Sequence, residues 1–274
     1  MKKILVPTDF SEQAEKALEV AAQLAKQHES EIYLLNVLDL PLHEIDPLKG
    51  YNDLPEAVFF MKLAHKKFEE LVKKDYLDGI TVHETVEFHD IYKAINSVCE
   101  KHKIDLVVMG SYGASGFKEL LIGSNTEKVV RTCETPVLVV KKRHQEFKVE
   151  HFVFASDFKE EAKVPFLKAL KFAEFFNAEM HLLMVVTANK FVTTAEAKYR
   201  IQGFLDTVTH SFCSIHIYND ETIEKGIMNF SQSIDADLIG MSTHGRQGLS
   251  HFFNGSISED LVNHARRPVM TFRI

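Results

Sequence analysis

Short apolar runs alternate along the chain with segments in which apolar residues recur every three or four positions. Residues 4–7 and 32–37 are apolar runs, and residues 11–27 between them place alanines and a leucine on one face of a helix. The first pattern predicts buried strands, and the second predicts an amphipathic helix. Ser11 precedes the helical segment and is the expected N-cap, because its hydroxyl can accept a free amide of the first turn.

Apolar runs and helical segments continue to alternate through the first half of the chain. We predict helices over 55–74, 90–102 and 125–132, and strands over 80–88, 105–109 and 137–140. The strand at 80–88 alternates polar and apolar residues, which is typical of a strand near the edge of a sheet. Alternating strands and helices, with nearly continuous apolar strands elsewhere, indicate an α/β fold with a parallel sheet covered on both faces.

The chain contains an internal repeat. Residues 3–10 resemble residues 151–158, and residues 33–37 resemble residues 181–185 at the same offset. We therefore predict two tandem domains, 1–142 and 149–274, joined by the charged segment 141–150. The first copy carries extra residues, mainly in a proline-containing stretch at 38–54 that we expect to form a long loop.

The composition argues against several classes of protein. The 274 residues carry 32 basic and 39 acidic side chains, a net charge of −7, so no global attraction to nucleic acid or to anionic membranes is expected. No apolar run reaches the roughly 20 residues that span a bilayer, and we expect a cytoplasmic protein. Three cysteines without a C-x-x-C pair indicate neither a disulfide framework nor a thiolate metal site.

A glycine-rich segment follows the predicted strand at 105–109. Gly110, Gly113 and Gly123 precede Ser124, where a helix is predicted to begin. Glycines allow a close approach of the backbone, and the free amides of a helix N-terminus favour an anion such as phosphate. A glycine-rich turn without a ligand is the alternative. The sequence contains no Walker A loop, no G-x-G-x-x-G motif and no nucleophile elbow.

Three motifs together carry a family resemblance. The spacing Gly110-x2-Gly113-x9-Gly123-Ser124 resembles the nucleotide-binding signature of ATP-binding universal stress proteins, and segments 6–11 and 135–140 resemble the beginning and end of that domain. The resemblance implies two Rossmann-like domains, each a five-stranded parallel sheet of order 3-2-1-4-5 with helices on both faces. In that order, ligands bind at the carboxyl ends of the first and fourth strands.

The resemblance also implies roles for residues of the first copy. Thr8 and Asp9 would lie at the nucleoside, the backbone of Val37 at the base, and Met109 with Gly110 at the ribose and first phosphate. The phosphates would be held by Gly113, Gly123, Ser124 and Asn125. Two alternatives remain open: Asp9 as the N-cap of the first helix, and Met109 as an ordinary core residue.

The corresponding residues of the second copy form a second candidate site. They are Asp157, Val185, Met241, Gly245, Gly255 and Ser256. Ser242 replaces the first glycine of the signature and Ser156 replaces Thr8. A side chain at position 242 could obstruct a ligand, so the first copy is the expected nucleotide site.

The expected function is that of a stress-response regulatory protein that binds ATP, ADP or AMP, with or without magnesium. A slow ATPase, or a nucleotide-free scaffold or small-ligand carrier, are the alternatives. No catalytic residues are assigned, and no metal site, because His83 and His89 fit a polar strand face better than a ligand set. The apolar fifth strands, 137–140 and 269–272, are exposed edges that invite pairing with each other, so we expect an intramolecular pseudo-dimer. Higher assembly and the protein partner stay open.

Overall fold

A computed structural model describes residues 1–38, 54–88, 90–111, 124–206, 213–243, 261–262 and 264–274. Each half of the chain forms a strand-helix series, as the alternating pattern predicts. In the first half the elements are β1 (Lys3–Pro7), α1 (Glu12–His28), β2 (Glu31–Leu38), α2 (Leu54–Leu71), η2 (Asp75–Leu77), β3 (Val82–Phe88), α3 (Ile91–His102), β4 (Leu106–Gly110), α4 (Ser124–Thr132) and β5 (Val137–Val140). No helix in the described part of the chain is long and apolar enough to cross a membrane.

The described residues of the second half repeat the order of the strands. Its elements are β6 (His151–Ala155), η3 (Glu160–Ala162), α5 (Lys163–Phe176), β7 (Glu179–Val186), α6 (Thr194–Leu205), β8 (Cys213–Asn219), α7 (Ile223–Ser233), β9 (Leu238–Thr243) and β10 (Val269–Arg273). A short 3-10 turn precedes α5, whereas α1 is α-helical from its first turn.

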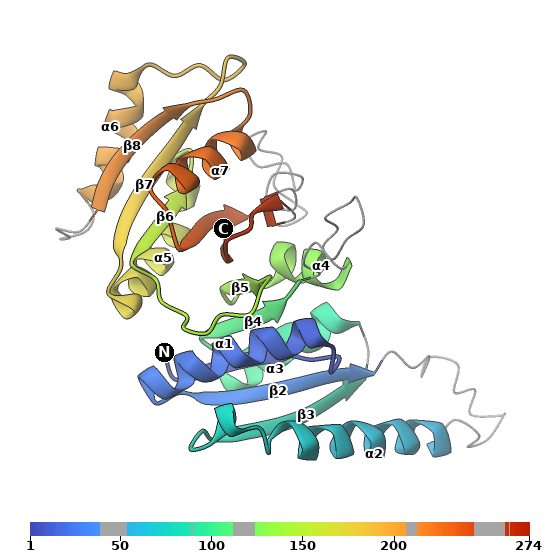
Figure 1. Cartoon of the computed structure of the whole chain (residues 1–274). Coiled ribbons are helices and arrows are strands. Elements are labelled where there is room, and N and C mark those ends of the chain that lie inside the picture. The colour runs from blue at the N-terminus through green and yellow to red at the C-terminus, as the bar shows by residue number, and fades with distance from the viewer. Residues whose placement is uncertain (39–53, 89, 112–123, 207–212, 244–260, 263) are drawn as a thin grey trace, which may run out of the picture.

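The ten strands found among the described residues belong to one sheet of order β3-β2-β1-β4-β5-β10-β9-β6-β7-β8. Each half is parallel and has the order 3-2-1-4-5, which confirms the fold that the resemblance implies. The halves join where β5 pairs antiparallel with β10, with Leu138 opposite Met270. The two fifth strands therefore cover each other's apolar edge within one chain, and the halves lie side by side along the sheet (Figure 1).

Helices cover both faces of the sheet. One buried cluster contains side chains of α1, α2, α5 and α6, and the other contains side chains of α3, α4 and α7. Ser11 caps α1 as predicted, since its hydroxyl accepts the amide of Ala14 at 3.3 Å. Burial of the apolar helix faces supplies the main driving force for this three-layer arrangement.

The linker between the halves contains neither a helix nor a strand, as predicted, but it is packed. Phe147 and Val149 are buried in the cluster on the α1 and α5 face. Gln23 of α1 fixes the linker backbone: its Oε1 accepts the amide of Phe147 at 2.6 Å, and its Nε2 donates to the carbonyl of His144 at 3.0 Å. The linker is therefore part of the interface between the halves.

Candidate functional site

The carboxyl ends of β1 and β4 lie next to each other. Leu5 of β1 is in register with Val107 of β4, and both strands run in the same direction. From β1 the chain adds β2 and β3 on one side, and it then adds β4 and β5 on the other side, so the strand order reverses between β1 and β4. Crevices at such switch points are the usual ligand sites of open α/β sheets.

The loop after β1 is tightly fixed. Thr8 is buried, its amide donates to the carbonyl of Leu35 at 2.8 Å, and its carbonyl accepts Nδ2 of Asn36 at 2.8 Å. The Oγ1 of Thr8 also accepts the amide of Phe10 at 3.0 Å, and Phe10 has a φ of 62°. These bonds turn the backbone sharply, so that the residue between them, Asp9, points away from the sheet core.

Asp9 is exposed, and its Oδ1 accepts the amide of Ser11 at 2.9 Å. Because Ser11 itself caps α1, the N-cap alternative for Asp9 is wrong. One carboxylate oxygen thus shapes the loop, and the other has no hydrogen-bond partner among the described residues.

Gly110 ends β4 beneath the first turn of α1. A Cβ on Gly110 would lie 2.2 Å from the carbonyl oxygen of Gln13, closer than any side chain tolerates. The packing of α1 therefore requires a glycine at this position. The close approach of a ligand, the reason that our sequence interpretation gave, stays a prediction.

The N-terminal end of α4 also lies near Gly110, at the end of β4. Thr126, in its first turn, donates its hydroxyl to the carbonyl oxygen of Gly110 at 3.2 Å. The helix begins at Ser124, and Asn125 is exposed beside it. Within the described part of the chain, the buried hydroxyl of Ser111 has no hydrogen-bond partner. The first turn of α4 and the hydroxyl of Ser111, which is unpaired among the described residues, thus lie at the end of β4.

The remaining predicted residues of the first copy have different surroundings. The Met109 side chain is 5% exposed and packs in the buried cluster, as the core alternative predicts, and Val37 is half-buried against the same cluster. Gly113 and Gly123 lie outside the described residues, as do residues 39–53 of the loop predicted over 38–54. Leu38 ends β2, and Leu54 begins α2.

The second copy differs at its corresponding crevice. The hollow lined by Ser156, Asp157 and Val185 has a volume of about 10 Å³, room for one water molecule, and Ile227 of α7 borders it. Asp157 is buried, and its Oδ2 is 3.3 Å from Nζ of Lys159. Met241 and Ser242 are buried in β9, whereas Gly245, Gly255 and Ser256 lie outside the described residues.

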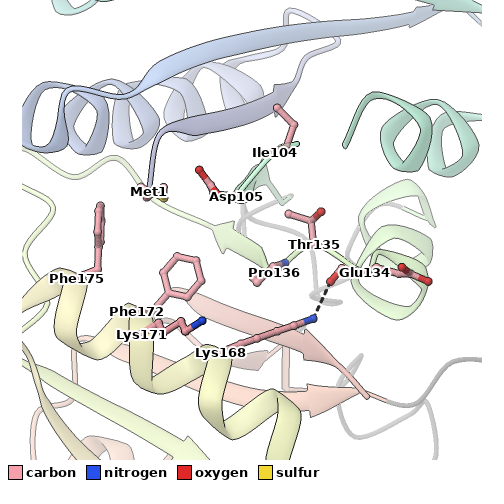
Figure 2. A pocket seen from close by; sticks show the side chains of 10 residues that line it. All are labelled: Met1, Ile104, Asp105, Glu134, Thr135, Pro136, Lys168, Lys171, Phe172 and Phe175. Carbon is pink, nitrogen blue, oxygen red and sulfur yellow. Dashed lines mark hydrogen bonds between the residues drawn. The ribbon is translucent and has the colours of Figure 1, made fainter. Parts of the chain in front are cut away.

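One larger cavity lies between the halves, at the other end of the first domain's strands (Figure 2). It has a volume of about 380 Å³ and is bordered by Met1, Asp105 and Pro136, which precede β1, β4 and β5. Phe172 of α5 faces it, and Lys168 of α5 donates to the carbonyl of Glu134 at 3.3 Å. This cavity is therefore separate from the carboxyl ends of β1 and β4, where Asp9 and Gly110 lie.

His83, one residue of the metal alternative, is occupied by structural contacts. Its Nε2 is 3.1 Å from Oε2 of Glu31, and its ring stacks on Tyr33 at 4.5 Å between centroids. The hydrogen bond from His83 lowers the pKa of Glu31. His89 lies outside the described residues.

Comparison with known proteins agrees with the repeated fold. Residues 1–141 and 214–273 match the model of the universal stress protein family. The chain belongs to this family. A universal stress protein of Methanocaldococcus jannaschii is 35% identical over 156 residues, which cover 52% of this chain and 96% of the relative. One of Synechocystis is 25% identical over 305 aligned positions and covers both chains fully.

Among solved structures, a universal stress protein of Archaeoglobus fulgidus has the same fold over nearly its whole length. Its TM-score is 0.78 at 24% sequence identity, with 99% of this chain and 98% of that chain covered. The tandem arrangement of two universal stress domains therefore has counterparts in both sequence and structure.

Proposed function

We propose that the first domain binds an adenine nucleotide at the carboxyl ends of β1 and β4, and that the protein acts as a nucleotide-dependent regulator in the stress response. The observation that carries this proposal is the exposed carboxylate of Asp9 on a rigid loop beside the end of β4, where α4 begins. The glycine signature supports it, because that motif resembles the one in ATP-binding members of the family.

The charges of the crevice suggest how the nucleotide is oriented. A carboxylate repels phosphate and accepts hydrogen bonds from hydroxyl or amino groups, so the nucleoside belongs at Asp9. The amides of a helix N-terminus attract negative charge, so the phosphates belong at the start of α4. Val37 is then on the nucleoside side, at the end of the neighbouring strand β2.

We further propose that the second domain does not hold a nucleotide. Its aspartate, Asp157, is buried and paired with Lys159, and Ile227 borders the small hollow that replaces the crevice. A nucleotide needs several hundred Å³, far more than the hollow that the described residues of the second copy form.

The test compares Asp9→Asn with the matched variant Asp157→Asn. Asparagine keeps the oxygen that accepts the amide of Ser11, so the loop is preserved and the negative charge alone is lost. Titration calorimetry with ATP, ADP and AMP, with and without magnesium, measures the affinity. We expect Asp9→Asn to weaken binding by about tenfold or more, the effect of one charge-assisted hydrogen bond, and Asp157→Asn to leave it unchanged. Equal affinities in wild type and Asp9→Asn would refute the proposed site.

A further inference from the structure

A row of histidines crosses three strands of the second domain at their amino ends. His151 of β6 is in register with Glu179 of β7, and His181 of β7 is in register with Ser214 of β8. Since alternate residues of a strand share a face, Glu179 and His181 point to the same side of the sheet. His216, two positions after Ser214, joins them there.

The spacing of these side chains fits the coordination sphere of a small metal ion. Nδ1 of His151 is 3.1 Å from Nε2 of His181 and 3.8 Å from Oε2 of Glu179, and one ligand atom of each residue lies within 4.8 Å of the others. Metal–nitrogen bonds of about 2.0–2.1 Å in a tetrahedral zinc site place ligand atoms about 3.3 Å apart. Small side-chain rotations therefore bring the three atoms around one ion.

A second layer of hydrogen bonds orients His181. Its Nδ1 is 2.8 Å from Oγ of Ser214, and that oxygen is 2.9 Å from Nε2 of His216. When His181 donates to the serine and the serine donates to His216, the lone pair of His181 Nε2 points toward His151 and Glu179. Metal-binding histidines characteristically donate their other ring N–H to such a partner.

His181 is largely shielded from solvent, and acidic side chains lie nearby. Its exposed fraction is 7%. The adjoining groove has a volume of about 950 Å³ and carries Glu150 and Glu174 in addition to Glu179. The carboxylate of Glu150 is paired with Lys148. Of the proposed ligands, His151 and Glu179 line this groove, whereas His181 does not.

We propose that His151, Glu179 and His181 bind a divalent transition-metal ion of the zinc class, with Ser214 as a positioning residue. Two imidazoles and one carboxylate are a ligand set typical of zinc, with the fourth position available to water or to a ligand from the groove. This site is distinct from the nucleotide crevice, which lies at the carboxyl ends of strands in the other domain.

The first domain provides an internal comparison. At the corresponding strand positions it has Lys3, Glu31 and Tyr33 in place of His151, Glu179 and His181. The Nζ atom of Lys3 lies 5.6 Å from the centre of the Tyr33 ring. We therefore expect neither the Lys3 ammonium nor the Tyr33 side chain to bind a metal ion. The carboxylate is thus common to both domains, whereas the two imidazoles occur only in the second.

The experiment measures zinc binding to the tag-free, metal-stripped full chain by titration calorimetry, and Co²⁺ binding by visible absorption. We expect one tight zinc ion per chain and a tetrahedral Co²⁺ spectrum. His151→Gln and His181→Gln each remove that ion, whereas His83→Gln in the first domain leaves it in place. Because His151 is half-exposed, its variant folds even if the His181 variant does not; circular dichroism verifies this.

Ser214 is tested by two substitutions. Ser214→Ala weakens zinc binding about 10- to 100-fold, the usual effect of losing such a partner, and Ser214→Thr restores it because the hydroxyl is kept. A wild-type chain without saturable zinc binding at micromolar concentrations would overturn the proposal. So would one tight ion that persists in both His151→Gln and His181→Gln.

Discussion

Gln13 lies directly over Gly110, and its carbonyl oxygen occupies the space that a side chain at position 110 would need. The contact involves the backbone of both α1 and β4, so neither partner can move aside by changing a rotamer. The first turn of α1 and the end of β4, which border the proposed nucleotide crevice, are thereby fixed to each other.

Replacing Gly110 therefore destabilises the first domain. We expect Gly110→Ala to cost about 1–3 kcal/mol of unfolding free energy, as overpacking does, measured by urea denaturation. Gly203→Ala in α6 is the control, because a Cβ there meets nothing within 4 Å. It should stabilise the chain by about 0.5–1 kcal/mol through helix propensity. Equal effects of the two substitutions would contradict the close packing.

The hydrogen bonds between Gln23 of α1 and the linker backbone can be tested by substitution. Gln23→Ala removes two hydrogen bonds to the linker backbone, so we expect a loss of about 1–2 kcal/mol and faster hydrogen exchange at Phe147. The exposed Gln27, one turn further along α1, should tolerate alanine within about 0.5 kcal/mol. Unchanged exchange at Phe147 would show that the linker is held by its apolar contacts alone.

A histidine of the linker, His144, should make the stability of the chain depend on pH. Burial, with the nearby charge of Lys142, lowers the pKa of His144, so the folded chain keeps this ring neutral. In the unfolded chain the His144 ring takes up a proton as the pH falls below about 6.5, whereas in the folded chain it does so only at a lower pH. The free energy of unfolding is therefore unaffected by His144 above that pH, and it decreases as the pH falls from about 6.5 toward the pKa of the folded chain. His144→Leu should reduce the decline in stability between neutral and mildly acidic pH, measured by urea unfolding. A decline of the same steepness in both proteins would rule out His144 as its source.

Two serines of the second domain should respond to alanine with opposite signs. The Ser242 hydroxyl is buried and lacks a partner among the described residues, so Ser242→Ala should stabilise the chain by about 1 kcal/mol. The Ser156 hydroxyl accepts the amide of Phe158 at 3.0 Å, so Ser156→Ala should destabilise it by about 1 kcal/mol. Thermal unfolding of the two variants, compared with wild type, distinguishes these outcomes by sign.

Local patterns predicted the elements well because each element buries its own side chains. The spacing of apolar residues predicted the bounds of α1 and β5 closely, and the capping hydroxyl of Ser11 correctly indicated where α1 begins. Alternation in β3 indicated a sheet edge, where that strand lies. The apolar fifth strands pointed to the antiparallel pairing of β5 with β10, since an exposed apolar edge needs a partner.

Other features depend on contacts between residues far apart in the chain. The packing reason for Gly110 became visible only when α1 was placed over β4, because no local pattern reports which backbone passes above a strand. In the same way, His151, Glu179 and His181 have no ligand spacing in sequence, and the register of β6 with β7 brings them together.

The sequence by itself determined the repeat, the strand-helix order and the family resemblance, because these follow from periodic burial and from short motifs. Only the tertiary structure decided that Asp9 is exposed while Asp157 is buried, and that histidines from separate strands converge. Burial and distance are properties of the packed chain, since they depend on which neighbours the folded sheet places beside each residue.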